Sequence, residues 1–269
     1  MQNPPTNVAL ITGASEGVGR ALAHQLARDA HYDAIVLASR SKERLTSLAA
    51  ELGHAGMRTL CIPTDITQPT QCAAMIAQVL EHFGRLDTLF NNAGATMWAP
   101  FEDITDLGIF RRVMDVNYFG ALYCTHAALP ALRASRGRIV VVASLAGITG
   151  VPYRSGYCAS KHAVIGFFES LRIELRDTGV SVTIVAPDFV VSNHHKRALT
   201  GDGTALGNTP LKERDIMSAE RCAELVSVAA QRRERLRITS VRGKLGRYVR
   251  LLFPKFIDRL AIKAIETGR

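Results

Sequence analysis

Residues 8–19 read VALITGASEGVG, a short apolar run followed by a turn rich in glycine. The run Val8 to Ile11 is typical of a strand buried on both faces of a parallel sheet. The turn has the spacing Gly-x-x-x-Gly-x-Gly, and a helical pattern begins at about Val18. A strand, a tight turn and a helix in this order predict the first repeat of a layered α/β domain.

The same alternation continues along the chain. Helical segments separate further apolar runs, which occupy residues 34–38, 59–62, 86–90, 139–143 and 180–185, and a run near 236–241 is a candidate seventh strand. These runs predict a doubly wound parallel sheet of about seven strands with helices on both faces. With 269 residues, 47% of them hydrophobic, the chain is long enough to bury one full core. No repeat or low-complexity linker indicates a second domain.

The composition excludes several classes of protein. Residues 1–7 lack a charged segment followed by an apolar run, so we expect no secretory signal. No stretch approaches the roughly 20 apolar residues that span a bilayer. The five cysteines include no Cys-x-x-Cys pair, which argues against a zinc site and a disulfide framework. We therefore expect a cytoplasmic protein without a bound metal.

The net charge of +9 belongs to the C-terminal tail. Residues 232–269 hold 12 of the 33 Lys and Arg residues and 3 of the 24 Asp and Glu residues, a surplus of 9. The preceding 231 residues hold 21 of each sign and are neutral. An enzyme that acts on nucleic acid usually carries positive charge around its cleft, so we expect no nucleic-acid partner.

The glycine turn has the features of a phosphate cradle. Backbone N–H groups at the start of a helix, together with the helix dipole, attract an anion, and small residues let it approach the backbone. A bare tight turn is the alternative, but its place between a strand and a helix favours a bound dinucleotide. The residues expected to hold the pyrophosphate are Gly13, Ser15, Glu16, Gly17, Val18 and Gly19.

The end of the second predicted strand indicates which dinucleotide binds. An acidic residue there would bind the ribose 2′-hydroxyl of NAD, but the chain has Ser39 and Arg40. A guanidinium suits a 2′-phosphate, so we predict NADP(H), with NAD(H) kept open and a solvated Arg40 as the alternative. After the third run, Asp65 and Ile66 could contact the adenine, or Asp65 could cap the helix that begins near Pro69. Small residues after the fourth run permit close approach to the cofactor, and we assign Asn92, Ala93 and Gly94 to its site.

Tyr157 and Lys161 stand four residues apart and share one helix face. Free tyrosine titrates near about 10, and lowering this pKa by about 3 units with a nearby ammonium takes roughly 4 kcal/mol. Such a phenol could give a proton to a carbonyl oxygen, or take one from an alcohol, while hydride moves to or from a nicotinamide. Ser144, at a strand end, would hold the same oxygen and argues against a mere surface pair. Lys161 would also bind the nicotinamide ribose, and Asn117 would support a water that relays the proton.

Together these motifs resemble the short-chain dehydrogenase/reductase family. The resemblance rests on Thr12-Gly13-x-x-x-Gly17-x-Gly19, Asn91-Asn92-Ala93-Gly94, Asn117, Ser144 and Tyr157-x-x-x-Lys161, in the family's order and spacing from about Val8 to Ser192. It implies a single Rossmann domain, NAD(P) chemistry, and an Asn-Ser-Tyr-Lys tetrad in the roles given above. It also implies a homo-oligomer, the common state in the family, and Arg40 resembles the NADP-preferring members.

The chain departs from the family pattern after the sixth predicted strand. The family usually has Pro-Gly followed four residues later by Thr, whereas this chain reads Pro187-Asp188-Phe189-Val190-Val191-Ser192. The resemblance assigns Pro187, Val190 and Ser192 to the cofactor site, with Ser192 replacing the threonine that binds the carboxamide. Asp188 would either receive a hydrogen bond from a polar substrate or cap the lid that follows.

Two C-terminal segments lack strand periodicity. Residues 188–217 are expected to form a substrate lid, and Ser218 to cap the helix after it. We interpret His194 and His195 as solvated rather than as a metal pair, because no carboxylate or cysteine ligand accompanies them. The tail, residues 232–269, is basic and amphipathic, and Pro254 divides it. It could pack on another subunit or over the active site, lie on an anionic membrane, or stay solvated.

The sequence therefore predicts one Rossmann domain over residues 1–269, with a cofactor-binding and catalytic core at 7–192. The expected activity is NADP-dependent interconversion of a secondary alcohol and a ketone. The tail resembles those of lipid- and steroid-directed reductases in the family, which favours a hydrophobic substrate. One alternative is a non-catalytic NADP-binding redox sensor, which would not need Tyr157 and Ser144. Another is a methyltransferase, which would leave the tyrosine–lysine pair unexplained.

Overall fold

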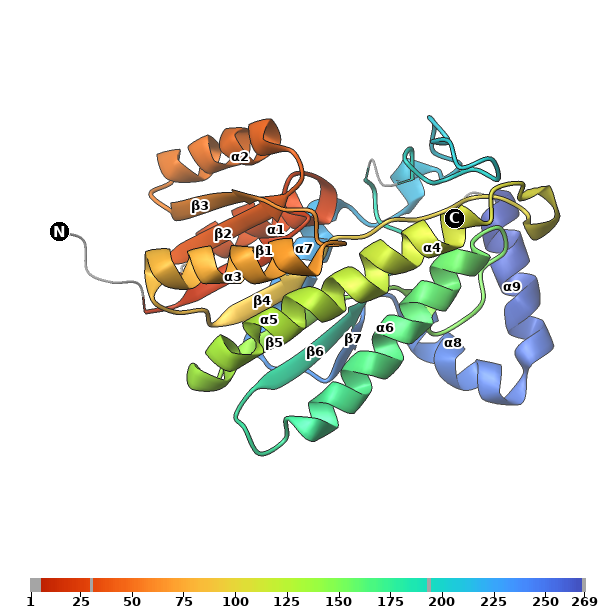
Figure 1. The fold of residues 1–269 in the computed structure, drawn as a ribbon. Helices are drawn as coiled ribbons and strands as arrows, with labels where there is room; N and C mark the ends of the chain where they lie inside the picture. The colour runs from red at the N-terminus through yellow and green to blue at the C-terminus, as the bar shows by residue number, and fades with distance from the viewer. Residues whose placement is uncertain (1–5, 30, 193–194, 268–269) are drawn as a thin grey trace.

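A parallel seven-stranded sheet organises the residues that the computed structural model describes, which are 6–29, 31–192 and 195–267. The strand order is β3-β2-β1-β4-β5-β6-β7 (Figure 1). The prediction of one doubly wound domain is confirmed, including its seventh strand. The strands are β1 (Val8–Thr12), β2 (Ala34–Ser39), β3 (Arg58–Pro63), β4 (Thr88–Asn91), β5 (Arg138–Val142), β6 (Ser181–Ala186) and β7 (Leu236–Ile238).

Helices cover both faces of the sheet, because alternate residues of a buried strand point to opposite sides. In β1, Leu10 packs into one core with Phe168, whereas Ile11 packs into the other with Leu26. The Leu10 core includes residues of α3 (Pro69–Phe83), α5 (Gly120–Ala134) and α6 (Ser155–Glu174). The Ile11 core includes residues of α1 (Gly17–Arg28), α2 (Lys42–His54) and α7 (Ala219–Gln231). Figure 1 shows α3, α5 and α6 in front of the sheet.

The strand order reverses beside β1. The chain runs outward from β1 through β2 to β3, and then returns to place β4 on the other side of β1. The loops that leave β1 and β4 therefore diverge and open a crevice at the carboxyl ends of these strands. Ligands of doubly wound folds bind in such a crevice, and the glycine turn lies at its edge.

Serine caps set the start of α7 and α8, as Ser41 does for α2. Ser218 caps α7 as predicted, and its hydroxyl accepts the Arg221 N–H at 3.1 Å. Ser240 caps α8 (Val241–Leu252) by accepting the Gly243 N–H at 3.1 Å. This second cap ends the seventh strand earlier than predicted, because the chain turns into a helix where the apolar pattern still reads as a strand.

The last described elements are the lid and the tail. The predicted lid, residues 188–217, contains no helix or strand among its described residues beyond a 3-10 turn at Glu213–Asp215. Its Leu199 binds the loop after β4, through the Thr96 carbonyl and the Trp98 N–H, both at 2.9 Å. The tail forms α8 and α9 (Pro254–Thr267), divided at Pro254 as predicted (Figure 1). No helix in the described ranges is long and apolar enough to cross a membrane.

Candidate active site

One large cavity lies at the carboxyl ends of the strands. It has a volume of about 1320 Å³, and its walls come from the glycine turn, the strand ends, α6, the lid and the tail. Nearly every predicted site residue lines it, from both the cofactor set and the catalytic set. They are Gly13, Ser15, Glu16, Gly17, Val18, Arg40, Asp65, Ile66, Asn92, Ala93, Gly94, Ser144, Tyr157, Lys161, Pro187, Val190 and Ser192.

The turn leaves no room for a side chain at Gly13 or at Gly19. Gly13 has a φ of +67°, and a Cβ there would lie 2.8 Å from the Cα of Ala93. A Cβ at Gly19 would lie 2.2 Å from the carbonyl oxygen of Gly13, so Gly19 packs α1 against the turn and is not part of the cavity wall. The residue before α1, Glu16, makes no side-chain cap, which leaves the first N–H groups of α1 for an anion. The turn thus fits a dinucleotide pyrophosphate.

Polar groups at the end of β2 also fit a dinucleotide. The Ser39 hydroxyl oxygen is buried and has no hydrogen-bond partner among the described residues, and Ser39 lines the cavity. Arg40, exposed beside it, lines the same wall. Because buried polar groups usually have partners, a cofactor oxygen would complete this end of the site.

Glu16, a predicted cofactor contact, holds two arginines beside the glycine turn. Its carboxylate forms ion pairs with Arg44 of α2, at 3.1 Å, and with Arg197 of the lid. Both arginines line the cavity, as Arg40 does. Three guanidinium groups suit a phosphate, although Glu16 competes for two of them.

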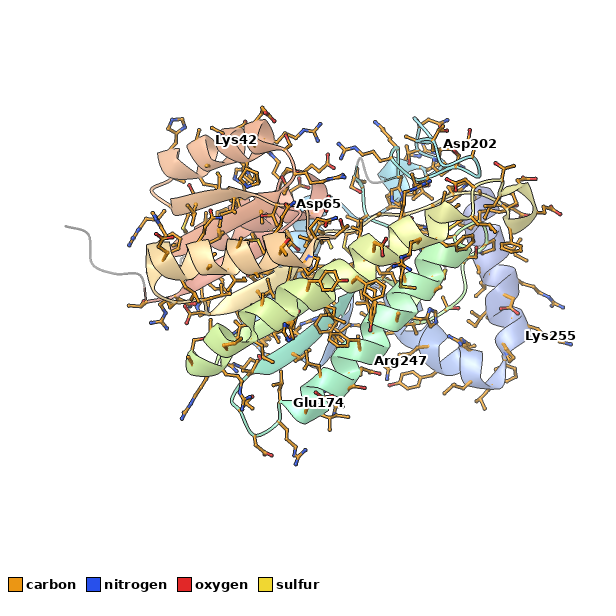
Figure 2. All side chains as sticks on the ribbon, viewed as in Figure 1. Lys42, Asp65, Glu174, Asp202, Arg247 and Lys255 are labelled. Carbon is orange, nitrogen blue, oxygen red and sulfur yellow. The ribbon has the colours of Figure 1, made fainter. Side chains whose placement is uncertain are left out.

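Asp65 closes a turn before α3. Its Oδ1 accepts hydrogen bonds from the Thr67 N–H at 3.0 Å and the Thr67 hydroxyl at 2.8 Å. The residue at the N-cap of α3 is Gln68, whose side chain makes no cap bond. Asp65 is therefore not the N-cap residue of α3, and the capping alternative is wrong. Asp65 also lines the cavity, near the carboxyl ends of the strands (Figure 2), and its adenine contact stays a prediction.

Helix α6 buries the predicted acid and its ammonium. Tyr157 and Lys161 are 7% and 5% exposed, so they are not a solvated surface pair. The Lys161 Nζ lies 5.8 Å from the centroid of the Tyr157 ring and donates to the Val142 carbonyl at 3.0 Å. Burial lowers the pKa of Lys161; the charge of Tyr157 opposes this shift and that of Arg154 adds to it. A phenol and an ammonium close together in a buried cavity suit proton transfer.

Ser144 lies where β5 meets the cavity. Its hydroxyl oxygen accepts the Ala146 N–H at 3.2 Å and so caps the 3-10 helix Leu145–Gly147. A hydroxyl that accepts one bond still has its own proton to donate. Ser144 can therefore offer a hydrogen bond to a substrate oxygen in the cavity that Tyr157 lines.

Asn117 is buried but is not part of the cavity wall. It lies in a π-helical turn, Asp115–Phe119, between α4 (Gly108–Met114) and α5. Its amide oxygen accepts the Ala95 N–H at 2.8 Å, and its amide nitrogen donates to the Ala95 carbonyl at 2.9 Å and to Ser160 at 2.8 Å. These bonds join the loop after β4 to helix α6. Support of a relay water stays a prediction.

Two buried cavity residues with titratable side chains are absent from the predicted set. Arg154 is 3% exposed and its guanidinium carbon lies 4.2 Å from the Tyr157 ring centroid. Its place three residues before Tyr157 was the available signal, since such residues share a helix face. His195 is 6% exposed, with Nε2 3.2 Å from the Val190 carbonyl, so its solvated interpretation is wrong. His194 lies outside the described residues.

The surroundings of His195 determine its charge. Burial lowers its pKa to about 4, with a further contribution from the positive charge of Arg154. The histidine is therefore neutral near pH 7. No group of three His, Cys, Asp or Glu side chains in the described part of the chain could hold a metal ion.

Asp188 joins the lid to the tail. Its carboxylate accepts the N–H of the next residue, Phe189, at 2.9 Å. The same carboxylate accepts the Ser240 hydroxyl at 2.7 Å and Nε and Nη2 of Arg242 at 2.6 and 2.8 Å. Burial alone would raise the pKa of Asp188, but the bonds from Arg242 and Ser240 lower it overall. The sequence does not predict this contact with the tail.

The tail closes one side of the cavity. A Cβ at Gly243 of α8 would lie 2.7 Å from Leu145, and Arg250 donates to the Ile148 carbonyl. Ile257 and Leu260 of α9 line the cavity. Of the interpretations of the tail, the structure therefore supports packing over the candidate active site.

Comparisons with known proteins give the family of the chain. Residues 7–202 match the family model described as short chain dehydrogenase. The chain belongs to the short-chain dehydrogenase family. This short-chain dehydrogenase is an oxidoreductase that uses a nicotinamide cofactor.

Its curated relatives include two proteins that are longer than this chain. The 11-beta-hydroxysteroid dehydrogenase 1A of Arabidopsis thaliana is 36% identical over 261 residues, which cover 93% of this chain and 73% of that protein. A dehydrogenase/reductase SDR family protein 7-like of Dictyostelium discoideum is 34% identical over 262 residues, with 95% and 81% covered.

Two solved structures resemble this short-chain dehydrogenase over most of its length. A family member from Burkholderia phymatum in complex with NAD has a TM-score of 0.81 at 25% identity, covering 95% of this chain and 96% of that one. An alcohol dehydrogenase from Thermococcus sibiricus complexed with 5-hydroxy-NADP has a TM-score of 0.73 at 27% identity, covering 86% and 94%.

Proposed function

We propose that this enzyme interconverts a secondary alcohol and a ketone with NADP(H), on a hydrophobic, lipid- or steroid-like substrate. The observation that supports the proposal is a single cavity shared by the glycine turn and by Ser144, Tyr157 and Lys161. A dinucleotide held on the turn would occupy one part of the cavity and leave the part beside Tyr157 for the substrate.

In this proposal Tyr157 is both acid and base. During reduction its phenol gives a proton to the ketone oxygen, and during oxidation its phenolate takes the alcohol proton. The bound nicotinamide supplies or accepts the hydride. Ser144 donates a hydrogen bond to the same substrate oxygen and orients it. Lys161 favours the phenolate and binds the nicotinamide ribose, while Asn117 holds the neighbouring loop and supports a relay water.

The preference for NADP is proposed from charge at the adenosine end. Strand β2 ends without an acid, and Arg40, Arg44 and Arg197 line the cavity there. Guanidinium groups form short, charge-assisted bonds with phosphate oxygens. The solved relatives favour neither cofactor, since one was solved with NAD and the other with 5-hydroxy-NADP.

The preference for an apolar substrate is proposed from the cavity wall. Four apolar side chains line the same cavity as Tyr157. They are Phe189 and Leu199 of the lid, and Ile257 and Leu260 of α9. Transfer of apolar surface from water into such a space is favourable by about 25 cal/mol per Å². The names of the Arabidopsis relatives, hydroxysteroid dehydrogenases, support the same class.

We further propose a homo-oligomer formed through the α5–α6 side of the sheet. Tyr118, Phe119, Tyr123 and Phe167 stack there and remain partly exposed. A second copy would bury these aromatic side chains. Light scattering after gel filtration is expected to give a dimer or larger; a monomer at every concentration would remove this proposal.

The outer face of the tail supports a further proposal, contact with an anionic membrane surface by a cytoplasmic enzyme. Leu251 and Leu252 are each 77% exposed and Phe253 is 63% exposed. Lys244 of α8 is exposed, and Lys255 of α9 projects away from the sheet (Figure 2). Apolar side chains flanked by cations match the chemistry of a negatively charged lipid surface.

The proposed reaction is tested by following NADPH absorbance with steroids, retinoids, fatty-acyl ketones and sugars. We expect turnover of an apolar ketone, and a loss of about 10²- to 10⁴-fold in Tyr157→Phe with NADPH binding retained. Tyr248→Phe, at an exposed residue of α8 that is not part of the cavity wall, is the matched control and should keep its activity. NADPH binding without turnover of any ketone would favour the redox-sensor alternative, and full activity in Tyr157→Phe would contradict the mechanism.

A further inference from the structure

Arg154 lies closer to the ring of Tyr157 than Lys161 does. Its guanidinium carbon is 4.2 Å from the ring centroid, whereas the Lys161 Nζ is 5.8 Å away. Arg154 is the N-cap residue of α6, three residues before Tyr157, and the start of the helix places both side chains together. It is 3% exposed and lines the cavity.

No carboxylate forms an ion pair with Arg154 among the side chains that the structure describes. Its Nη2 donates to the Thr96 hydroxyl at 2.8 Å, and its Nε is buried without a hydrogen-bond partner there. The rings of Trp98 and Phe189 lie 5.9 and 5.8 Å from the guanidinium carbon. With Tyr157, three aromatic rings offset part of the cost of burying this cation.

The titratable neighbours of Tyr157 leave two cations beside it near pH 7. Burial raises the pKa of the Cys158 thiol, and the pKa of His195 is about 4, so both groups are neutral. Burial lowers the pKa of Arg154, which the charge of Tyr157 opposes; an arginine nevertheless keeps its proton in proteins. The charged groups that face the phenol from α6 are therefore Arg154 and Lys161.

We propose that Arg154 is a second positioning cation for this reaction: it stabilises the negative charge left on Tyr157 after proton transfer and fixes the ring in place. The inference rests on the proposed function, because it requires Tyr157 to be the proton donor. The phenol passes its proton to the ketone oxygen, and the guanidinium keeps all of its own. A cation over the ring face favours the ionised form, because the charge of a phenolate spreads into the ring.

This role of Arg154 predicts in which direction the pH profile of alcohol oxidation shifts when the guanidinium is removed. The rate rises with pH as the phenolate forms, and without the guanidinium ionisation is less favourable. We expect Arg154→Met to move the midpoint of this rise in kcat upward by about one pH unit, and Arg154→Lys, which keeps the charge, to move it less. Thr96→Val is the matched control: it removes the hydrogen bond to Arg154 and leaves the charge, so its midpoint should stay at the wild-type pH.

The outcomes separate this inference from the proposed function. The role of Arg154 alone is overturned by the following result: the wild type is active, Tyr157→Phe is inactive, and Arg154→Met leaves the midpoint of the pH profile unmoved. Absence of wild-type turnover overturns both. If Arg154→Met fails to fold by circular dichroism, Arg154→Gln and Arg154→Lys decide. Failure of all three to fold makes Arg154 a structural residue and overturns the inference.

Discussion

His195 illustrates at the residue scale how burial and one neighbour make a side chain sensitive to acid. Its pKa is about 4 in the folded protein, against about 6.5 for a free histidine. Between these values the unfolded chain binds a proton that the folded chain does not, so acid favours unfolding. The contribution of the neutral, buried His195 to the free energy of unfolding is fully present above about pH 6.5. It falls by up to about 3 kcal/mol as the pH is lowered toward 4.

We therefore expect His195→Gln to reduce the loss of stability in acid. Urea unfolding near pH 7 and near pH 5 measures the free energy of unfolding in each form. The difference between the two pH values should be smaller in the variant than in the wild type. His54→Gln, at the exposed end of α2, is the matched control and should keep the wild-type difference. An unchanged difference in His195→Gln would contradict the assignment.

Arg40 carries a second prediction at this scale. Arg40→Asp places a negative charge where a 2′-phosphate would lie, so we expect NADPH binding to weaken at least about tenfold, or about 1.4 kcal/mol. NADH has no 2′-phosphate, and its binding should weaken less. Fluorescence titration with both cofactors measures the ratio, with Arg28→Asp, an exposed change at the far end of α1, as control. Equal losses for both cofactors would argue for the solvated interpretation of Arg40.

At the level of secondary structure, one ion pair joins helix α8 to the segment after β6, beside the candidate active site. Arg242 and Ser240 hold the Asp188 carboxylate, whose side chain is 13% exposed. Arg242→Gln would leave this carboxylate poorly paired, at a cost of about 1 to 3 kcal/mol. Because the pKa of Asp188 is lowered, the contact is fully present at neutral pH and is lost only as pH falls through that lowered value.

We expect Arg242→Gln to loosen the tail without unfolding the sheet. Limited trypsin cleavage should occur faster in residues 241–267, while the urea midpoint of the core changes little. Arg259 of α9 forms no ion pair among the described residues. Arg259→Gln changes the charge of the tail by the same amount and serves as the control. Equal cleavage rates in the two variants would show that the Asp188 contact does not hold the helix.

Local spacing explains which elements could be predicted. The buried run of β1, the glycine turn and the pair Tyr157 and Lys161 are defined within a few residues, and each lies as expected. The contact of Asp188 with Arg242 joins residues 54 apart in sequence, so it exists only once β6 and α8 are folded together. The helix period places Arg154 on the same helix face as Tyr157. The importance of Arg154 depends on its burial, which the helix period does not predict.

At the scale of the whole molecule, the charge asymmetry coincides with the exposed apolar face. The sheet and its helices carry the neutral part of the chain, while α8 and α9 carry most of the excess cations. We expect the protein to sediment with vesicles containing phosphatidylserine and not with phosphatidylcholine alone, and added salt to weaken the binding.

Two variants test whether vesicle binding requires the exposed apolar face of the tail or occurs at any exposed apolar side chain. Leu252→Asp places a charge at a residue that is 77% exposed on the tail, and it should abolish vesicle binding. Leu107→Asp makes the same change at a residue that is 67% exposed near α4, and it should bind as the wild type does. Equal binding by both variants, or binding to neither kind of vesicle by the wild type, would remove the membrane proposal.

The pairing of Glu16 with Arg197 joins the glycine turn to the lid across 181 residues of sequence. Both side chains line the cavity. We therefore expect a dinucleotide that leaves the turn to disturb this bond. The pair is partly exposed, and dissolved ions weaken such bonds. Raising ionic strength should accordingly hasten cofactor exchange. Hydride transfer in a single turnover, which in the proposed mechanism depends on the buried Tyr157, should keep its rate.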